Sequence, residues 1–158
     1  KEGDSLANVT FLKDEDMIVI TEQGFSIHFS TAEISPIGRV TSGVRAIKLM
    51  DGDRIVVGLP IHKDTDEIAL FLSNGVGKKV PLSEYPLQAR GGKGVITYKA
   101  SPDNRVVGAA MVDEKDNLLL IGNPNSIYKK KKEVPSLTRV GLGNIMIKNS
   151  HILSVVKL

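Results

Sequence analysis

The chain has 158 residues, of which 41% are hydrophobic and 25% are charged, a composition typical of one globular domain with a hydrophobic core. Its apolar runs fall short of the roughly 20 residues that span a bilayer, and it contains no cysteine, which excludes transmembrane helices, disulfides and thiolate metal sites. We therefore expect a cytoplasmic protein. The net charge of +3 is too small to indicate a polyanionic partner by itself. Because the sequence opens on Lys1 and not on Met, we also expect it to be part of a longer protein.

The first apolar run, residues 17–21, is followed by Gln23-Gly24 and then by residues 25–29, in which apolar and polar side chains alternate. This pattern predicts two antiparallel strands joined by a tight turn. Two further hairpins are predicted in the same way, from residues 68–72 to 76–80 and from residues 118–121 to 127–129.

A glycine-bearing connection follows each hairpin and leads to a predicted strand that ends in a lysine, at Lys48, Lys99 and Lys148. A polar turn and one more apolar strand come next, as in residues 54–58. No long helical pattern is visible between these strands. The sequence therefore predicts an all-β fold with about four strands in each unit.

The predicted strands belong to a sequence repeat of about fifty residues. Residues 43–48 return as residues 94–99 and again as residues 143–148, at intervals of 51 and 49 residues. Four strands in about fifty residues are typical of a propeller blade. We therefore predict a single domain over residues 1–158, with repeats at about 1–50, 51–100 and 101–158.

The middle repeat contains the basic glycine-rich segment Gln88-Ala89-Arg90-Gly91-Gly92-Lys93-Gly94. This segment resembles the glycine-rich box, Gln-Arg-Arg-Gly-Gly-Lys-Gly, of the C-terminal domain of the A subunit of bacterial type IIA topoisomerases, DNA gyrase and topoisomerase IV. It departs from that box only at Ala89. Residues 38–45 and 74–85 also resemble blade motifs of that domain, so the resemblance covers essentially the whole chain.

The resemblance implies a β-pinwheel of about three four-stranded blades that exchange strands, either as an open arc or as part of a six-bladed disc. It implies that the rim binds, bends and wraps duplex DNA without sequence specificity, as an accessory domain of an ATP-dependent type II topoisomerase. The expected partners are double-stranded DNA, the rest of the A subunit, and the ATPase B subunit, with no membrane. The chain alone is not expected to be an enzyme, because the catalytic tyrosine is expected upstream of it, and no cofactor or metal is expected in this domain.

A DNA-wrapping surface needs cationic side chains at intervals, because duplex DNA presents a dense line of negative charge. Glycines in addition let main-chain N–H groups approach phosphate oxygens closely. We predict DNA contacts from residues at comparable places in the three repeats. The first repeat supplies Arg39, Arg45 and Lys48; the second supplies Lys78, Lys79, Gln88, Arg90, Gly91, Gly92, Lys93, Gly94 and Lys99; the third supplies Lys129, Lys130, Arg139 and Lys148.

Other functions are open at this stage. A protein-interaction propeller that does not wrap DNA fits the small net charge, whereas only 4% of the residues are aromatic, which disfavours a single-strand reader that stacks bases. Residues 129–132 are four lysines predicted to lie on a strand, where about two would face each side, and such an edge can also serve only to prevent aggregation. Asp64, Asp66, Asp113 and Glu114 suggest a metal or acid–base site, although their place at repeated turns favours solvated turn residues.

Overall fold

The computed structural model describes residues 3–13, 15–62 and 67–158. In this part of the chain the regular structure consists of strands and three 3₁₀ turns, η1 (Thr31–Glu33), η2 (Leu82–Glu84) and η3 (Lys131–Glu133), and no helix there could cross a membrane. In chain order the strands are β1 (Asp16–Thr21), β2 (Phe25–Ser30), β3 (Ile55–Ile61), β4 (Glu67–Leu72), β5 (Val76–Pro81), β6 (Val95–Ile96), β7 (Val106–Val112), β8 (Asn117–Asn123), β9 (Ile127–Lys130), β10 (Asn144–Ile145) and β11 (His151–Lys157). The predicted all-β fold class is confirmed.

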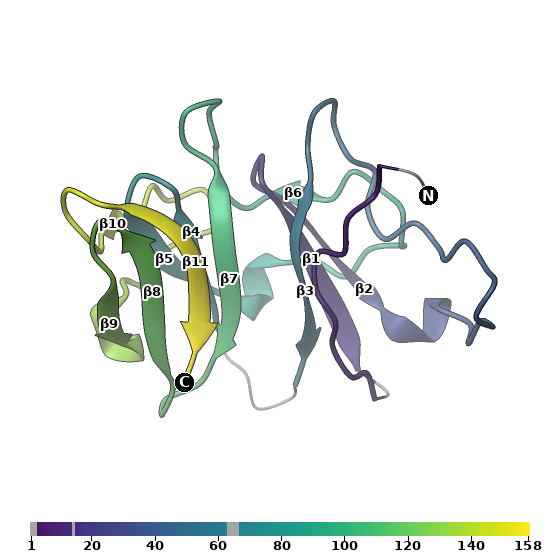
Figure 1. Ribbon diagram of the computed structural model, residues 1–158. Coiled ribbons are helices and arrows are strands. Elements are labelled where there is room, and N and C mark those ends of the chain that lie inside the picture. Colours follow the sequence, from purple (N-terminus) through teal and green to yellow (C-terminus); the bar gives the residue numbers. More distant parts are fainter. Residues whose placement is uncertain (1–2, 14, 63–66) are drawn as a thin grey trace.

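The strands form three antiparallel sheets that lie side by side (Figure 1). Each sheet is built on a hairpin, β1–β2, β4–β5 or β8–β9, and a later strand, β3, β7 or β11, pairs with the first strand of that hairpin. The short strands β6 and β10 pair with the second strand of the first two hairpins. The sheet orders are therefore β3-β1-β2-β6, β10-β5-β4-β7 and β11-β8-β9, and β7 contacts both β3 and β11 (Figure 1).

Each of the first two sheets takes strands from more than one of the predicted repeats. The first sheet joins the hairpin β1–β2 to β3 and β6, which lie in the predicted second repeat. The second sheet joins β4–β5 to β7 and β10, which lie in the predicted third repeat. The exchange of strands that the resemblance implied is therefore present. The strand β6 follows the hairpin of the second sheet but pairs in the first, and β10 follows the hairpin of the third sheet but pairs in the second.

The predicted strands that end at Lys48, Lys99 and Lys148 are shorter than expected or absent. Only the two-residue strands β6 and β10 pair with a neighbour, and residues 43–48 form no strand. The prediction of a full strand at these three places is wrong, because the segment pairs only where the outer strand of a preceding hairpin lies beside it.

Close packing against a hairpin turn ends these short strands. After β6, the main-chain N–H groups of Thr97 and Tyr98 both donate to the Gly24 carbonyl oxygen, at 2.7 and 3.1 Å. Gly24 has a φ of +84°, and a Cβ there would lie 2.0 Å from the Tyr98 carbonyl oxygen. Likewise, a Cβ on Gly75 would lie 2.5 Å from the Ile147 carbonyl oxygen. Glycine is therefore required both by the turn and by the backbone that packs against it.

The core lies between the sheets, and the middle hairpin contributes to it from both faces. Ile68, Leu70 and Leu72 of β4 pack into one buried cluster with side chains of the first sheet. The alternate residues, Ala69 and Phe71, pack into a second buried cluster with side chains of the third sheet. This alternation is the period of a strand buried on both faces, and apolar burial on both sides holds the three sheets face to face.

Candidate nucleic-acid interface

The middle glycine loop, residues 88–94, runs from η2 to β6 along the edge of the first sheet. The Gly91 N–H donates to the Ala46 carbonyl oxygen at 2.7 Å. Gly91 and Gly94 have φ values of +85° and +73°, and a Cβ on Gly94 would lie 2.1 Å from the Ser26 carbonyl oxygen. The glycines therefore let this loop lie directly against the main chain of the first sheet.

Arg90 attaches the middle glycine loop to the first sheet through both its main chain and its side chain. Its main-chain N–H donates to Oε2 of Glu33 at 3.0 Å, and its guanidinium Nη1 donates to the Arg45 carbonyl oxygen at 2.5 Å. The Arg90 side chain is half-buried, and its Nε is buried with no hydrogen-bond partner among the described residues. The guanidinium is thus directed at the protein, whereas the sequence predicted that it contacts DNA.

Arg139 lies at the corresponding position of the third glycine loop, residues 137–143. Its main-chain N–H donates to Oε2 of Glu84 at 3.0 Å, its Nε donates to the Glu84 carbonyl oxygen at 3.1 Å, and its Nη1 donates to the Ile96 carbonyl oxygen. Arg139 is also half-buried. Sequence reasoning placed Arg90 and Arg139 at comparable positions, but it did not identify the glutamates that hold them.

Lys78 does not lie on an exposed surface, and the prediction that it does is wrong. Its side chain is fully buried, because its position on β5 faces the interior. Its Nζ donates to the carbonyl oxygens of Thr138, Arg139 and Gly141, at 3.3, 2.6 and 2.8 Å, and lies 5.0 Å from the Tyr98 ring centroid. Burial, and then the nearby Arg139 charge, lower the pKa of Lys78 to about 8. The buried ammonium of Lys78 therefore holds the third glycine loop in place through these hydrogen bonds.

Lys79 is also buried, which again differs from the prediction. Its Nζ lies 3.3 Å from Oε2 of Glu67, and the same oxygen lies 3.3 Å from Nζ of Lys131, which in turn contacts Glu114 at 3.1 Å. Burial opposes the charge of Lys131, but the two carboxylates raise its pKa on balance. Burial likewise opposes the charge of Glu67, but the Ser136 hydroxyl and the two lysines lower its pKa on balance. Lys131, which follows β9 of the third sheet, therefore joins that sheet to β4 of the second through its ion pair with Glu67, whereas the Lys79 ion pair lies within the second sheet.

The lysine run 129–132 does not stay on one strand, so the predicted alternation is wrong. Lys129 and Lys130 end β9, and the following two lysines lie in η3. The Lys130 N–H donates to Oε2 of Glu133 at 2.8 Å, and Lys129 Nζ lies 3.7 Å from Oε1. The hydrogen bond from Lys130, together with the Lys129 charge, lowers the pKa of Glu133. Lys129 is half-buried beside this carboxylate, whereas Lys130 is exposed.

Seven of the predicted cations are exposed in the structure. They are Arg39, Arg45, Lys48, Lys93, Lys99, Lys130 and Lys148, and we refer to them as the seven exposed cations. The Lys48 N–H donates to the Gly92 carbonyl oxygen at 2.8 Å, which brings Lys48 and Arg45 to the middle glycine loop beside Lys93. Of the remaining predicted residues, Gly92 is exposed and Gln88, Gly91 and Gly94 are half-buried.

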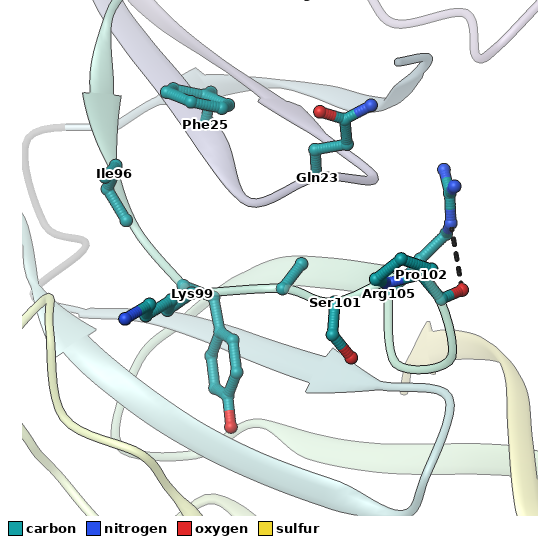
Figure 2. Close-up of a pocket in the computed structure, with 9 residues that line it drawn as sticks. Gln23, Phe25, Ile96, Lys99, Ser101, Pro102 and Arg105 are labelled. Atoms are coloured by element: carbon teal, nitrogen blue, oxygen red, sulfur yellow. Dashed lines mark hydrogen bonds between the residues drawn. The ribbon is translucent and has the colours of Figure 1, made fainter. Parts of the chain in front are cut away.

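A hollow of about 330 Å³ lies beside β6 (Figure 2). Its lining residues are Gln23, Phe25, Ile96, Tyr98, Lys99, Ala100, Ser101, Pro102 and Arg105. Lys99 and Arg105 stand at opposite ends of it (Figure 2), and Nη1 of Arg105 lies 3.3 Å from Oε2 of Glu22. None of the lining residues is Asp, Glu or His.

The acidic residues considered from the sequence do not form a site in the described part of the chain. Asp64 and Asp66 lie outside the described residues. Oδ1 of Asp113 accepts the Lys115 N–H at 3.0 Å, as in a turn, and Glu114 takes part in the ion pair with Lys131. Within residues 3–13, 15–62 and 67–158, no group of three or more His, Asp or Glu side chains could hold a metal ion.

Comparison with known sequences identifies similar proteins along most of the chain. A family model described as "DNA gyrase C-terminal domain, beta-propeller" matches residues 15–61 and 66–113. The DNA gyrase A subunit of Lawsonia intracellularis (strain PHE/MN1-00) is 35% identical over 153 residues, which are 94% of this chain and 19% of that protein. The DNA gyrase A subunit of Escherichia coli (strain K12) is 32% identical over 160 residues, which are 99% of this chain and 18% of that protein. The chain thus spans less than a fifth of the length of these curated relatives.

Comparison with solved structures identifies the same architecture. A structure described as "Crystal structure of the C-terminal domain of DNA topoisomerase IV" aligns with a TM-score of 0.85 and 23% identity, over 91% of this chain and 46% of that chain. A structure described as "Structure of DNA gyrase A C-terminal domain" aligns with a TM-score of 0.82 and 27% identity, over 94% of this chain and 52% of that chain. The predicted β-pinwheel fold is therefore confirmed, although among the described residues the third sheet has three strands and not the predicted four.

Proposed function

Since the chain belongs to the DNA gyrase C-terminal domain family, we propose that it binds, bends and wraps duplex DNA without sequence specificity, as a domain of the A subunit of a type IIA topoisomerase. The observation that carries the proposal is that the seven exposed cations come from all three repeats of the pinwheel. A periodic scaffold supplies cations at intervals, which a continuous polyanion can contact one after another.

Energetics favour such a distributed surface over a single binding pocket. Duplex DNA carries one negative charge per about 1.7 Å of its axis, and bending a site of about 20–30 base pairs costs of order 1–6 kcal/mol. Several phosphate contacts must offset that cost, and contacts with the backbone carry no sequence information. The seven exposed cations suit this role, because a phosphate contact is the same at every base pair.

The proposal includes the setting in which the domain acts. We assign it to the cytoplasm, without a membrane, and its partners are double-stranded DNA, the rest of the A subunit, and the ATPase B subunit. Strand cleavage is assigned to a tyrosine outside this chain, so the domain acts as an accessory part of the enzyme. It is proposed to need no cofactor of its own.

The experiment that tests the proposal is a titration of the domain with fluorescent duplexes of different sequence over a range of salt concentrations. If about seven phosphates are contacted, affinity should fall roughly 10³–10⁵-fold between about 50 and 200 mM salt, about equally for every sequence. Lys48→Gln combined with Lys93→Gln should make the salt dependence less steep, whereas Lys115→Gln, an exposed lysine outside the proposed surface, should leave it unchanged. A nearly flat salt dependence in the wild type would refute the proposal.

A second function, a protein-interaction module without DNA wrapping, is favoured by one observation. Lys78, Lys79, Arg90 and Arg139 make contacts within the protein, so fewer cations are exposed than the sequence predicted. Charge reversal separates the two functions. Under DNA wrapping, Lys48→Glu with Lys93→Glu lowers duplex affinity broadly, whereas under protein docking the wild type binds DNA weakly and these changes have little effect.

A further inference from the structure

Two arginines of the glycine loops make two corresponding hydrogen bonds, and Arg139 makes one more, from its Nε to the Glu84 carbonyl oxygen. The main-chain N–H of Arg90 donates to Glu33, and that of Arg139 donates to Glu84, both at 3.0 Å. The guanidinium Nη1 of each arginine donates to a carbonyl oxygen of the preceding repeat. The two glutamates are 51 residues apart and each is the last residue of a 3₁₀ turn. The arrangement is therefore a repeated part of the fold and not a chance contact at one loop.

The two loops share the residues that attach them and differ in the residue that carries free charge. At an interval of 49 residues, Arg90 and Arg139 correspond, and so do the glycines at 92 and 94 with those at 141 and 143. Lys93, which is exposed, corresponds to Leu142, which is also exposed. The arginine is present in both loops, although the third loop has no lysine at the position of Lys93. The feature that the two arginines share is attachment to the preceding repeat, so we assign the arginine to that role.

We infer that Glu33 with Arg90, and Glu84 with Arg139, are clamps between neighbouring repeats, and that these four are positioning residues that hold the glycine loops against the sheets. The inference deepens the proposed DNA-binding function and rests on it in one respect: Lys93, and not Arg90, then makes the phosphate contact of the middle glycine loop. A planar guanidinium with donors in a fixed fork suits this role, which a lysine ammonium cannot reproduce.

The third glutamate of the series shows what the carboxylate does without a loop. Glu133 is the last residue of η3, as Glu33 and Glu84 are of η1 and η2. Among the described residues no glycine loop covers it, and its carboxylate accepts the Lys130 N–H at 2.8 Å and lies 3.7 Å from Lys129. A carboxylate at this position therefore accepts a main-chain N–H in every repeat, and it accepts one from the glycine loop in the two repeats where such a loop is seated.

Amide hydrogen exchange of the purified domain tests the clamp directly. The Gly91 N–H, bonded to Ala46, and the Lys48 N–H, bonded to Gly92, report whether the middle glycine loop is seated. Arg90→Lys keeps the charge and Glu33→Gln keeps the size, and each is expected to speed exchange at both amides about tenfold or more. Strand β4 serves as the reference for global unfolding. Should Arg90→Lys also loosen β4, the milder Glu33→Gln decides the outcome.

Duplex binding of the same variants tests the assignment of the phosphate contact. Lys93→Gln should make the slope of log affinity against log salt less steep by about 0.9 while leaving exchange unchanged. Arg90→Lys should weaken binding several-fold with an unchanged slope. The clamp is overturned if Arg90→Lys and Glu33→Gln leave both amides protected, or if Arg90→Gln changes the slope as Lys93→Gln does without affecting exchange. If the wild type does not bind DNA, the proposed function fails, and the exchange measurements still decide the clamp.

Discussion

Replacing Lys78 by Met is expected to destabilise the domain, although lysine is the charged residue and methionine the apolar one. Met has a similar length and fills the buried space without a charge. It leaves the carbonyl oxygens of Arg139 and Gly141 without the lysine donor, whereas that of Thr138 still accepts the Gly141 N–H at 3.0 Å. An ammonium that satisfies three carbonyl groups can be worth more than an apolar side chain that satisfies none.

The magnitude follows from the lengths of the three bonds. Two are short, at 2.6 and 2.8 Å, and the third is 3.3 Å. A hydrogen bond to a charged group contributes about 1.5–3 kcal/mol, so the two short bonds contribute about 3–6 kcal/mol before the cost of burying the ammonium. That cost is substantial, since burial lowers the pKa of Lys78 to about 8. We expect a net loss of about 2 kcal/mol, which lowers Tm by about 4–8 °C for a domain of this size.

Thermal and urea unfolding measure this loss, with Lys115→Met as the matched control, because Lys115 is exposed. The control should change the free energy of unfolding by no more than about 0.5 kcal/mol. Hydrogen exchange in the third glycine loop should also rise in Lys78→Met before the sheets unfold. An unchanged or higher Tm would show that the buried charge costs more than its three bonds contribute, and the stabilising role of Lys78 would then be refuted.

Three further measurements test the pKa of Lys78, the packing of Gly94 and the ion pairs of Glu67. Burial lowers the pKa of Lys78 from its ordinary 10.5 to about 8, so between about pH 8 and 10 the unfolded chain binds this proton more tightly than the folded protein does. The free energy of unfolding of the wild type, relative to that of Lys78→Met, should therefore rise over this pH range. A relative fall would contradict the lowered pKa. Gly94→Ala places a Cβ 2.1 Å from a β2 carbonyl oxygen and should prevent folding, whereas Gly43→Ala, with similar φ but open space, should cost about 1–2 kcal/mol in thermal unfolding; equal losses would exclude the clash. Glu67→Gln removes the charge between two buried lysines and should cost about 3–5 kcal/mol in urea unfolding, and a loss below about 1 kcal/mol would contradict that ion-pair assignment.

The hairpins could be predicted from the sequence because their signals are local. Alternating apolar residues and an Asn-Gly or Gln-Gly turn lie within a dozen positions of each other. Residues 17–21 and 68–72 were predicted as strands, and the structure has β1 at Asp16–Thr21 and β4 at Glu67–Leu72. Residues 43–48 could not be predicted in this way. They match residues 94–99 in sequence, but they form no strand, since a strand at this position depends on an outer edge supplied by another hairpin.

The two buried lysines of β5 were misassigned because they were interpreted by charge alone. The repeat itself carried a corrective signal, since Lys78 lies 51 residues after Ile27. Ile27 is fully buried in the structure, and so is Lys78. A lysine at the position of a buried isoleucine needs hydrogen-bond acceptors nearby. The acceptors are main-chain carbonyl oxygens of the glycine loop in the next repeat, residues 137–143. Which carbonyl groups receive the ammonium depends on tertiary packing, which no local pattern contains.

The clamps explain why the sequence located the glycine loops correctly but could not divide their charges into roles. Arginine and lysine both add positive charge to a rim, and only their hydrogen-bond partners distinguish a positioning residue from a phosphate contact. The pairing of each arginine with a glutamate 55 or 57 residues earlier becomes visible once the strand exchange is known. If the clamps act as inferred, the third glycine loop, which has Leu142 in place of Lys93, keeps its shape but adds little to DNA affinity. Arg139→Gln should then loosen that loop in hydrogen exchange without changing the salt dependence of binding, and a flattened salt dependence would return Arg139 to the phosphate contacts.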